Sequence, residues 1–69
     1  METQKSPRLT RMQLTVLRLV TQGKTNKQVA DELFVTRRTV DYHLQIVYQK
    51  LEVSNRVQAF IRARDLGLV

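Results

Sequence analysis

Apolar residues recur at helical spacing along this chain, in stretches that polar residues or glycine separate. The first stretch begins after Thr10, which has Gln13 three residues on, the spacing of a capping box. It ends at Gly23, a residue that tolerates the left-handed backbone of a helix C-terminus. The stripe between them consists of Val16, Leu17 and Val20. The pattern predicts a helix that braces the others and carries no group suited to chemistry.

Two further helical patterns follow, with a tight joint between them. Thr25 and Gln28 repeat the capping-box spacing, and a new helix begins after Thr36. The apolar positions are Val29, Ala30 and Leu33 in the first pattern, and Val40, Leu44, Val47 and Leu51 in the second. Because only Phe34 and Val35 separate them, the two helices must meet at a steep angle. That proportion is typical of a helix-turn-helix motif, whose second helix enters a DNA major groove.

The last pattern predicts a fourth helix that Ser54 caps, that runs to about Asp65 and that Gly67 closes. Its inward face is expected to consist of Ala59, Phe60 and Ala63. A second apolar face remains, and a domain of this size has little interior left to cover it. That face is a candidate self-association surface, made of Val57, Ile61 and Arg64. The alternative is that its apolar members are ordinary scattered exposed side chains.

Composition limits the architecture to one small all-α domain of four helices, since no strand pattern or repeat occurs. The chain has 69 residues, near the lower size for a self-sufficient core, and no cysteine for a disulfide or thiolate site. A hydrophobic fraction of 42% is too high for disorder, yet no apolar run is long enough for a membrane helix. No signal peptide is visible, which favours the cytoplasm. We expect residues 1–8 to form a flexible tail and residues 9–69 to form the domain.

The formal charge of +6 is unevenly distributed. Residues 1–38 carry eight Lys or Arg against three Asp or Glu, whereas residues 39–69 carry four against three. This bias favours a polyanionic partner, although a basic surface also serves solubility. At the start of the second helix, free amides and the helix dipole favour a phosphate. The polar residues gathered there are Lys24, Thr25, Asn26 and Lys27. Alternatively, the threonine only caps the helix and the lysines are solvated.

The polar face of the third helix carries the candidate DNA-reading residues, Asp41, Tyr42 and Gln45. Gln45 suits adenine, Asp41 suits a cytosine amino group, and Tyr42 suits a thymine methyl or a phosphate. Candidate phosphate contacts at the helix start are Arg37, Arg38 and Thr39. Because a carboxylate repels phosphates, Asp41 either reads a base, penalises wrong sites, or is simply a first-turn acid that the helix dipole favours.

Little in the sequence suits catalysis. His43 is the only histidine and borders the buried stripe, so we interpret it as a packed, hydrogen-bonded structural residue. Ser54 lacks a neighbouring base and an oxyanion nest, and no glycine-rich phosphate loop occurs. We therefore expect no enzyme activity, no cofactor and no metal ion.

Several short motifs together resemble the LuxR/FixJ-type (GerE-like) helix-turn-helix DNA-binding domain. They are LT at 9–10, VL at 16–17, Gly23, TNKQVADEL at 25–33, TV at 39–40, His43, KL at 50–51, and NR with QA at 55–59. The resemblance implies a bacterial transcription regulator that binds double-stranded DNA as a homodimer, usually through the fourth helix, with the third in the major groove. It implies base contacts by Asp41, Tyr42 and Gln45. The phosphate contacts that it implies are Thr25, Asn26, Lys27, Arg38, Thr39 and Lys50.

The sequence departs from the family pattern at two places. The family usually has an Arg-Glu-x-Glu run where this chain has Met12, Gln13, Leu14 and Thr15. Acidic partners for Arg56 are therefore missing, and Gln13 is left as a neutral substitute. The common basic residue after Thr-Val is replaced by Asp41, which puts the usual base preference in doubt.

Other readings of the chain stay open at this point. It is either a stand-alone regulator, acting in the cytoplasm at the nucleoid, or the C-terminal domain of a longer one. The same scaffold also suits a module that docks on RNA polymerase, a sigma factor or another regulator. A basic helix lying on an anionic membrane is the weaker alternative, because the basic residues scatter over several helices.

Overall fold

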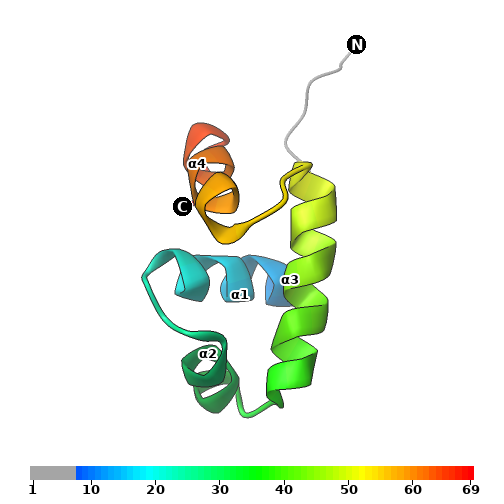
Figure 1. Ribbon diagram of the computed structural model, residues 1–69, viewed down its shortest axis with the longest axis vertical. Coiled ribbons are helices and arrows are strands. Elements are labelled where there is room, and N and C mark those ends of the chain that lie inside the picture. Colours follow the sequence, from blue (N-terminus) through cyan, green and yellow to red (C-terminus); the bar gives the residue numbers. More distant parts are fainter. Residues whose placement is uncertain (1–7) are drawn as a thin grey trace.

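The computed structural model describes residues 8–69 and contains four helices, with no strand in that range. They are α1 (Arg11–Thr21), α2 (Asn26–Leu33), α3 (Arg37–Leu51) and α4 (Arg56–Asp65). Figure 1 shows α3 upright, with α2, α1 and α4 following one another along one side of it. The predicted all-α fold of four helices is confirmed. Most of the predicted tail, residues 1–7, lies outside the described residues.

The first three helices begin at the predicted caps. Thr10 Oγ1 accepts the backbone N–H of Gln13 at 3.1 Å, and Gln13 Oε1 accepts the N–H of Thr10 at 3.0 Å. Thr25 and Gln28 form the same reciprocal pair, at 3.1 Å and 2.8 Å. Thr36 caps α3 with one 3.1 Å bond from the backbone three residues on. These bonds satisfy N–H groups that a helix start otherwise leaves without a partner.

The cap of α4 lies one residue after the predicted position. Asn55 Oδ1 accepts the N–H of Gln58 at 2.9 Å, so Asn55 is the N-cap. The prediction that Ser54 caps this helix was wrong, because asparagine is at least as good a cap as serine and the fold starts the helix after it. Ser54 instead donates its backbone N–H to Gln58 Oε1 at 2.8 Å.

A residue with a left-handed backbone lies in each of the three junctions between these helices, and another follows the last helix. Gly23 and Gly67 follow α1 and α4 at φ values of 93° and 74°, as the sequence predicts. Behind each glycine the next N–H reaches back into the last turn, and Leu68 donates to the Ala63 carbonyl at 2.8 Å. The ends of α2 and α3 are not glycines. Phe34 and Glu52 adopt φ values of 58° and 59°, a conformation that strains residues with a Cβ atom.

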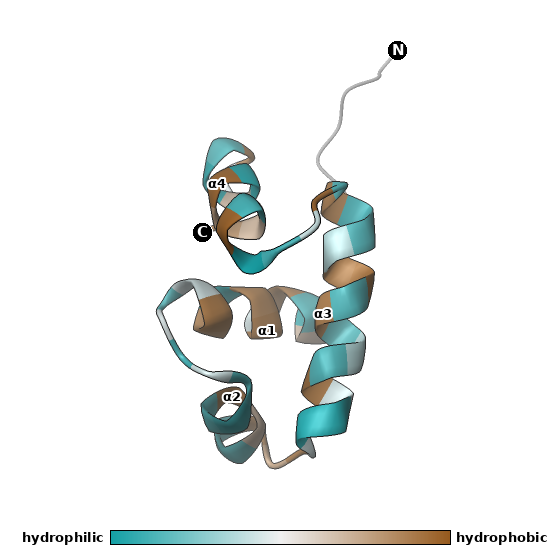
Figure 2. Cartoon of the chain, in the orientation of Figure 1, coloured by the Kyte–Doolittle hydropathy of each residue, from teal (hydrophilic) through white to brown (hydrophobic). Residues whose placement is uncertain are grey.

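The buried side chains form two clusters that α1 and α3 share. The first, which holds α2, consists of Val16, Val20, Val29, Ala30, Val40 and Leu44. The second, which holds α4, consists of Leu17, Val47, Leu51, Ala59 and Ala63. Tyr48 packs against both clusters. Figure 2 shows α1 as the most continuously apolar helix, consistent with its place between the two. The prediction that the first helix braces the others agrees with this arrangement.

The prediction that Phe60 lies in the interior was wrong. Phe60 is 39% exposed, and only the two alanines of the predicted inward face of α4 are buried. Its ring lies beside Arg64, whose guanidinium carbon is 5.8 Å from the ring centre. The close approach of α4 to α1 and α3 admits alanine side chains and leaves a large ring at the edge of the contact.

Candidate nucleic-acid interface

The turn between α2 and α3 sets the two helices at a steep angle. Figure 1 shows α2 nearly end-on beside an upright α3. Phe34 leaves the helix in the left-handed conformation, and Val35 donates its N–H back to the Ala30 carbonyl at 3.0 Å. Val40 and Leu44 bury one side of α3 against α2 and α1. The opposite side of α3 is therefore free to meet a partner.

All three candidate base-reading residues are exposed on α3. Tyr42 is 62% exposed, and its ring lies 5.6 Å from that of His43. Gln45 is exposed, and its side chain makes no hydrogen bond among residues 8–69. Asp41 is exposed too, but its Oδ1 accepts a 2.6 Å hydrogen bond from Asn26 Nδ2. One carboxylate oxygen of Asp41 is thus engaged within the chain before any DNA binds.

The lysines at the start of α2 are partly neutralised by acids of the same helix. Lys27 Nζ lies 3.2 Å from Asp31 Oδ2, with both side chains about two-thirds exposed. Lys24 Nζ lies 2.9 Å from Glu32 Oε2. Exposed pairs of this kind contribute little to stability, on the order of 0.2–1 kcal/mol, so either lysine exchanges its acid for a phosphate at small cost. The Thr25 hydroxyl already accepts the backbone N–H of Gln28 as the cap of α2.

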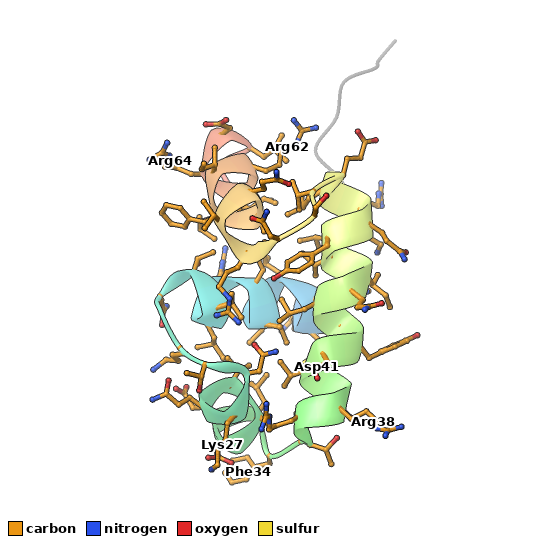
Figure 3. The ribbon with its side chains drawn as sticks, viewed as in Figure 1. Lys27, Phe34, Arg38, Asp41, Arg62 and Arg64 are labelled. Atoms are coloured by element: carbon orange, nitrogen blue, oxygen red, sulfur yellow. The ribbon has the colours of Figure 1, made fainter. Side chains whose placement is uncertain are left out.

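The start of α3 presents its two arginines without acidic partners. Arg37 and Arg38 are exposed, and neither takes part in an ion pair within the described residues. Figure 3 shows Arg38 projecting from α3 away from the other helices. Lys27 on α2 and Phe34, which follows α2, lie at the same end of the molecule. Thr39 Oγ1 lies 3.0 Å from Thr36 Oγ1. The cationic groups nearest the turn are therefore the ones most available to an anion.

Lys50 lies at the other end of α3 and is held by α1. Its Nζ donates to Gln13 Oε1 and to the Arg8 carbonyl, both at 2.9 Å. Both acceptors are uncharged, so neither forms an ion pair with the ammonium. The structure does not bring Lys50 together with the residues at the start of α2, so the candidate phosphate contacts lie at two ends of α3.

Arg56 is a charged residue of this region that sequence reasoning did not include among the site residues. Its Nη1 donates to the Lys24 carbonyl at 3.0 Å and its Nη2 donates to Asn26 Oδ1 at 2.7 Å. The expectation that Gln13 substitutes for the missing acidic partners of Arg56 was wrong, since Gln13 bonds to Thr10 and Lys50 instead. No local pattern in the sequence signals a contact between residues about thirty positions apart.

His43 differs in one respect from its predicted role. It is half-buried and packs beside Tyr42, as expected for a structural residue. Its Nδ1 atom, however, is buried without a hydrogen-bond partner among residues 8–69. The predicted hydrogen bond is therefore absent from that atom.

The predicted self-association surface lies on the outer side of α4. Val57 is 68% exposed and Ile61 is 45% exposed, so both present apolar area at the surface. Arg64 is exposed, and its guanidinium lies over the ring of Phe60. Phe60 is therefore a fourth member of this surface. We call Val57, Phe60, Ile61 and Arg64 the α4 surface. It lies on the opposite end of the molecule from α2 (Figure 3).

Other site types find no support within residues 8–69. No group of His, Asp or Glu residues there is arranged to hold a metal ion. None of the four helices has the length and apolar character needed to cross a bilayer.

The chain folds as four helices, and α2 and α3 form a tight helix-turn-helix. The surface of α3 that faces away from the core is exposed and partly basic. These features define a helix-turn-helix DNA-binding domain. Residues 7–63 match the family described as bacterial regulatory proteins, luxR family, also called GerE. The chain belongs to this family. The predicted resemblance is confirmed, and the chain is a LuxR-type transcription regulator or its DNA-binding domain.

Two proteins of Bacillus subtilis (strain 168) are similar in sequence to this chain. The spore germination protein GerE is 39% identical over 66 residues, which cover 96% of this chain and 89% of GerE. The transcriptional regulatory protein LiaR is 44% identical over 61 residues, which cover 88% of this chain and 29% of LiaR. The chain thus spans less than a third of LiaR. LiaR is a transcriptional regulatory protein and GerE is a transcription factor, so these relatives are regulators and not enzymes, in agreement with the non-enzymatic prediction.

Solved structures of the family have the same fold. The structure of the transcription factor GerE matches with a TM-score of 0.81 at 30% identity, over 87% of this chain and 90% of GerE. The response regulator ChrA, from a heme-sensing two-component system, matches with a TM-score of 0.86 at 34% identity. That match covers 99% of this chain and 33% of ChrA.

Proposed function

We propose that this chain binds double-stranded DNA in a sequence-specific manner by placing α3 in the major groove. The observation that carries the proposal is the division of α3 into two sides. Val40, Leu44 and Val47 are buried, while Asp41, Tyr42 and Gln45 are exposed on the same helix. Because the buried side fixes the helix to the domain, the outer side can meet base edges without reorganising the core.

Base reading and phosphate binding are assigned to different residues. Tyr42 and Gln45 contact base edges, and Asp41 contributes the carboxylate oxygen that Asn26 does not engage. The phosphate contacts are Thr25, Asn26, Lys27, Arg37, Arg38, Thr39 and Lys50. A regulator with this site acts where bacterial DNA lies, in the cytoplasm at the nucleoid.

Homodimerisation through the α4 surface completes the proposal. Exposed apolar side chains with a neighbouring guanidinium suit a small self-complementary contact. A dimer places two α3 helices on one face of the duplex, and half-sites then lie about one helical turn apart.

Selection of bound sites from random duplex DNA, with the 69-residue chain alone, tests sequence specificity. We expect one motif to be enriched, and an unenriched pool would refute the proposal. On the enriched duplex, the logarithm of the binding constant should fall steeply with the logarithm of salt concentration, by about 0.9 for each neutralised phosphate.

A second candidate function is docking on RNA polymerase or another regulator through the α4 surface. The exposure of Val57 and Ile61 favours it. Association through apolar contacts changes little between low and moderate salt, so the same titration separates the two functions.

A further inference from the structure

Asn26 connects three helices through its side-chain amide. It donates from Nδ2 to Asp41 on α3 at 2.6 Å, and its Oδ1 accepts from Arg56 at the start of α4 at 2.7 Å. Arg56 donates a second hydrogen bond to the Lys24 carbonyl at 3.0 Å. We call Asp41, Asn26 and Arg56 the Asn26 bridge. Its members come from positions 15 and 30 residues apart, so only the fold assembles it.

Asp41 fixes the orientation of the amide. An asparagine side chain has its donor on one atom and its acceptor on the other, whereas an ionised carboxylate only accepts. With Asp41 on the Nδ2 side, Oδ1 must face the guanidinium of Arg56. The carboxylate thus sets the position of a cation that it does not itself touch.

The charge of Arg56 is not neutralised by the groups that hold it. Both of its acceptors are uncharged oxygens, and the ion pairs given above for residues 8–69 involve only Lys24 and Lys27. A guanidinium has five N–H donors, and the two hydrogen bonds leave three of them available. Arg56 is therefore a full positive charge with a fixed orientation and spare donors, which suits the oxygens of a phosphate.

The location of Arg56 points to one phosphate in particular. It lines a shallow surface cleft together with Asn26, Asp41, Leu44, Gln45, Tyr48 and Ser54. Gln45 on the wall of this cleft is the proposed adenine reader. We infer that Arg56 binds a DNA phosphate next to the base pair that Gln45 reads, and that Asp41, acting through Asn26, is a positioning residue for this guanidinium. The inference rests on the proposed function and adds to it a residue and a role.

The first experiment compares Arg56→Ala with Arg62→Ala. Both remove one positive charge from α4, but Figure 3 shows Arg62 at the end of the molecule away from α2. We expect Arg56→Ala to weaken binding to every duplex of an operator panel by roughly tenfold, as for a lost charge-assisted hydrogen bond. The salt slope should fall by about 1, and Arg62→Ala should leave it unchanged. An unaltered slope for Arg56→Ala would overturn the phosphate contact.

The second experiment isolates the role of Asp41. Asp41→Asn and Asp41→Ala both remove the charge, but only asparagine keeps an oxygen that accepts from Asn26. We expect the alanine variant to bind several-fold more weakly than the asparagine variant, by the same factor on every duplex that lacks the base pair proposed for Asp41. In an Arg56→Ala background this difference should disappear. Equal affinities of the two variants, or a difference that persists without Arg56, would overturn the positioning role.

Two measurements keep these results interpretable. Arg56 also supports the loop before α2, so circular dichroism should establish that each variant folds, and Arg56→Gln replaces Arg56→Ala if alanine unfolds the domain. Glutamine keeps a neutral donor and lacks the charge, so the same loss of slope is expected. Binding by the wild-type chain distinguishes failure of the proposed function from failure of this inference. If the wild-type chain shows no selective, salt-dependent binding, the proposed function is contradicted. If the wild-type chain binds normally and the Arg56 variant binds equally well, only this inference is contradicted.

Discussion

At the scale of single residues, the outer side of α3 divides into side chains that are committed within the chain and side chains that are not. Asp41 is hydrogen-bonded to Asn26, whereas the side chain of Gln45 makes no hydrogen bond among the described residues and its amide can meet a base edge directly. Lys27 has an exposed acidic neighbour that a phosphate can replace. Discrimination between sequences should therefore depend more on Gln45 than on any lysine.

We predict that Gln45→Ala relaxes preference at about one base pair, at a cost of roughly 1–3 kcal/mol on the preferred operator. The amide of Gln45 pairs with an adenine edge, and alanine offers no donor or acceptor. Binding titrations over a panel of operator variants measure the effect. Lys27→Ala is the matched control and should weaken all variants alike. A uniform loss across the panel for Gln45→Ala would remove its base-reading role.

Local patterns identified residue roles well where the partner lies within one helical turn. The caps Thr10, Thr25 and Thr36 depend on neighbours three positions away, and all three are as predicted. Asn55 was missed because Ser54 beside it is an equally acceptable cap in sequence terms. The partners of Arg56 were not predictable, because they depend on how α2 and α4 approach one another.

At the scale of elements, the ends of α2 and α3 contain more strain than the ends of α1 and α4. Phe34 adopts a left-handed conformation although the residue is 95% exposed, so little burial offsets the strain. Glu52 repeats this conformation after α3. The sequence predicted a tight joint at Phe34 but not its backbone conformation, since phenylalanine is a rare choice there.

We predict that Phe34→Gly raises the free energy of unfolding by about 0.5–1 kcal/mol. Relief of left-handed strain, about 1–2 kcal/mol, exceeds the entropy that glycine adds to the unfolded chain. Chemical denaturation followed by circular dichroism measures it. The reverse change Gly23→Ala, at a φ of 93°, should lower stability. A less stable Phe34→Gly variant would mean that the exposed ring contacts the folded domain.

At the scale of the whole molecule, the proposed phosphate contacts at the starts of α2 and α3 lie at the opposite end from the proposed partner surface on α4. The start of α3 and α2 form one end, and the α4 surface forms the other (Figure 3). Composition and charge predicted a polyanionic partner and one small domain. Dimer geometry depends on a second copy, which no intrachain pattern specifies, so the apolar spacing of Val57 and Ile61 was the only available signal.

We predict that Ile61→Asp weakens binding to a two-half-site operator far more than binding to a single half-site. A buried carboxylate at the contact between two α4 helices is costly, whereas one half-site requires only one copy. Met12→Asp places the same charge at an exposed apolar position of α1 and is the control. Electrophoretic mobility shifts on both operators measure the effect. Similar losses on the two operators for Ile61→Asp would remove α4 from the dimer.

The buried residues of α4 are smaller than most of those of the other helices. Ala59 and Ala63 are the buried residues it contributes, while α1 and α3 interlock through larger branched side chains. Each methyl group removes little apolar area from water. The attachment of α4 to the other three helices therefore depends on these two small side chains, on the flanking Leu66 and Leu68, and on the hydrogen bonds of Arg56. We expect α4 to change its angle more readily than the other helices do when a second copy binds, because little apolar area is exposed by a small shift.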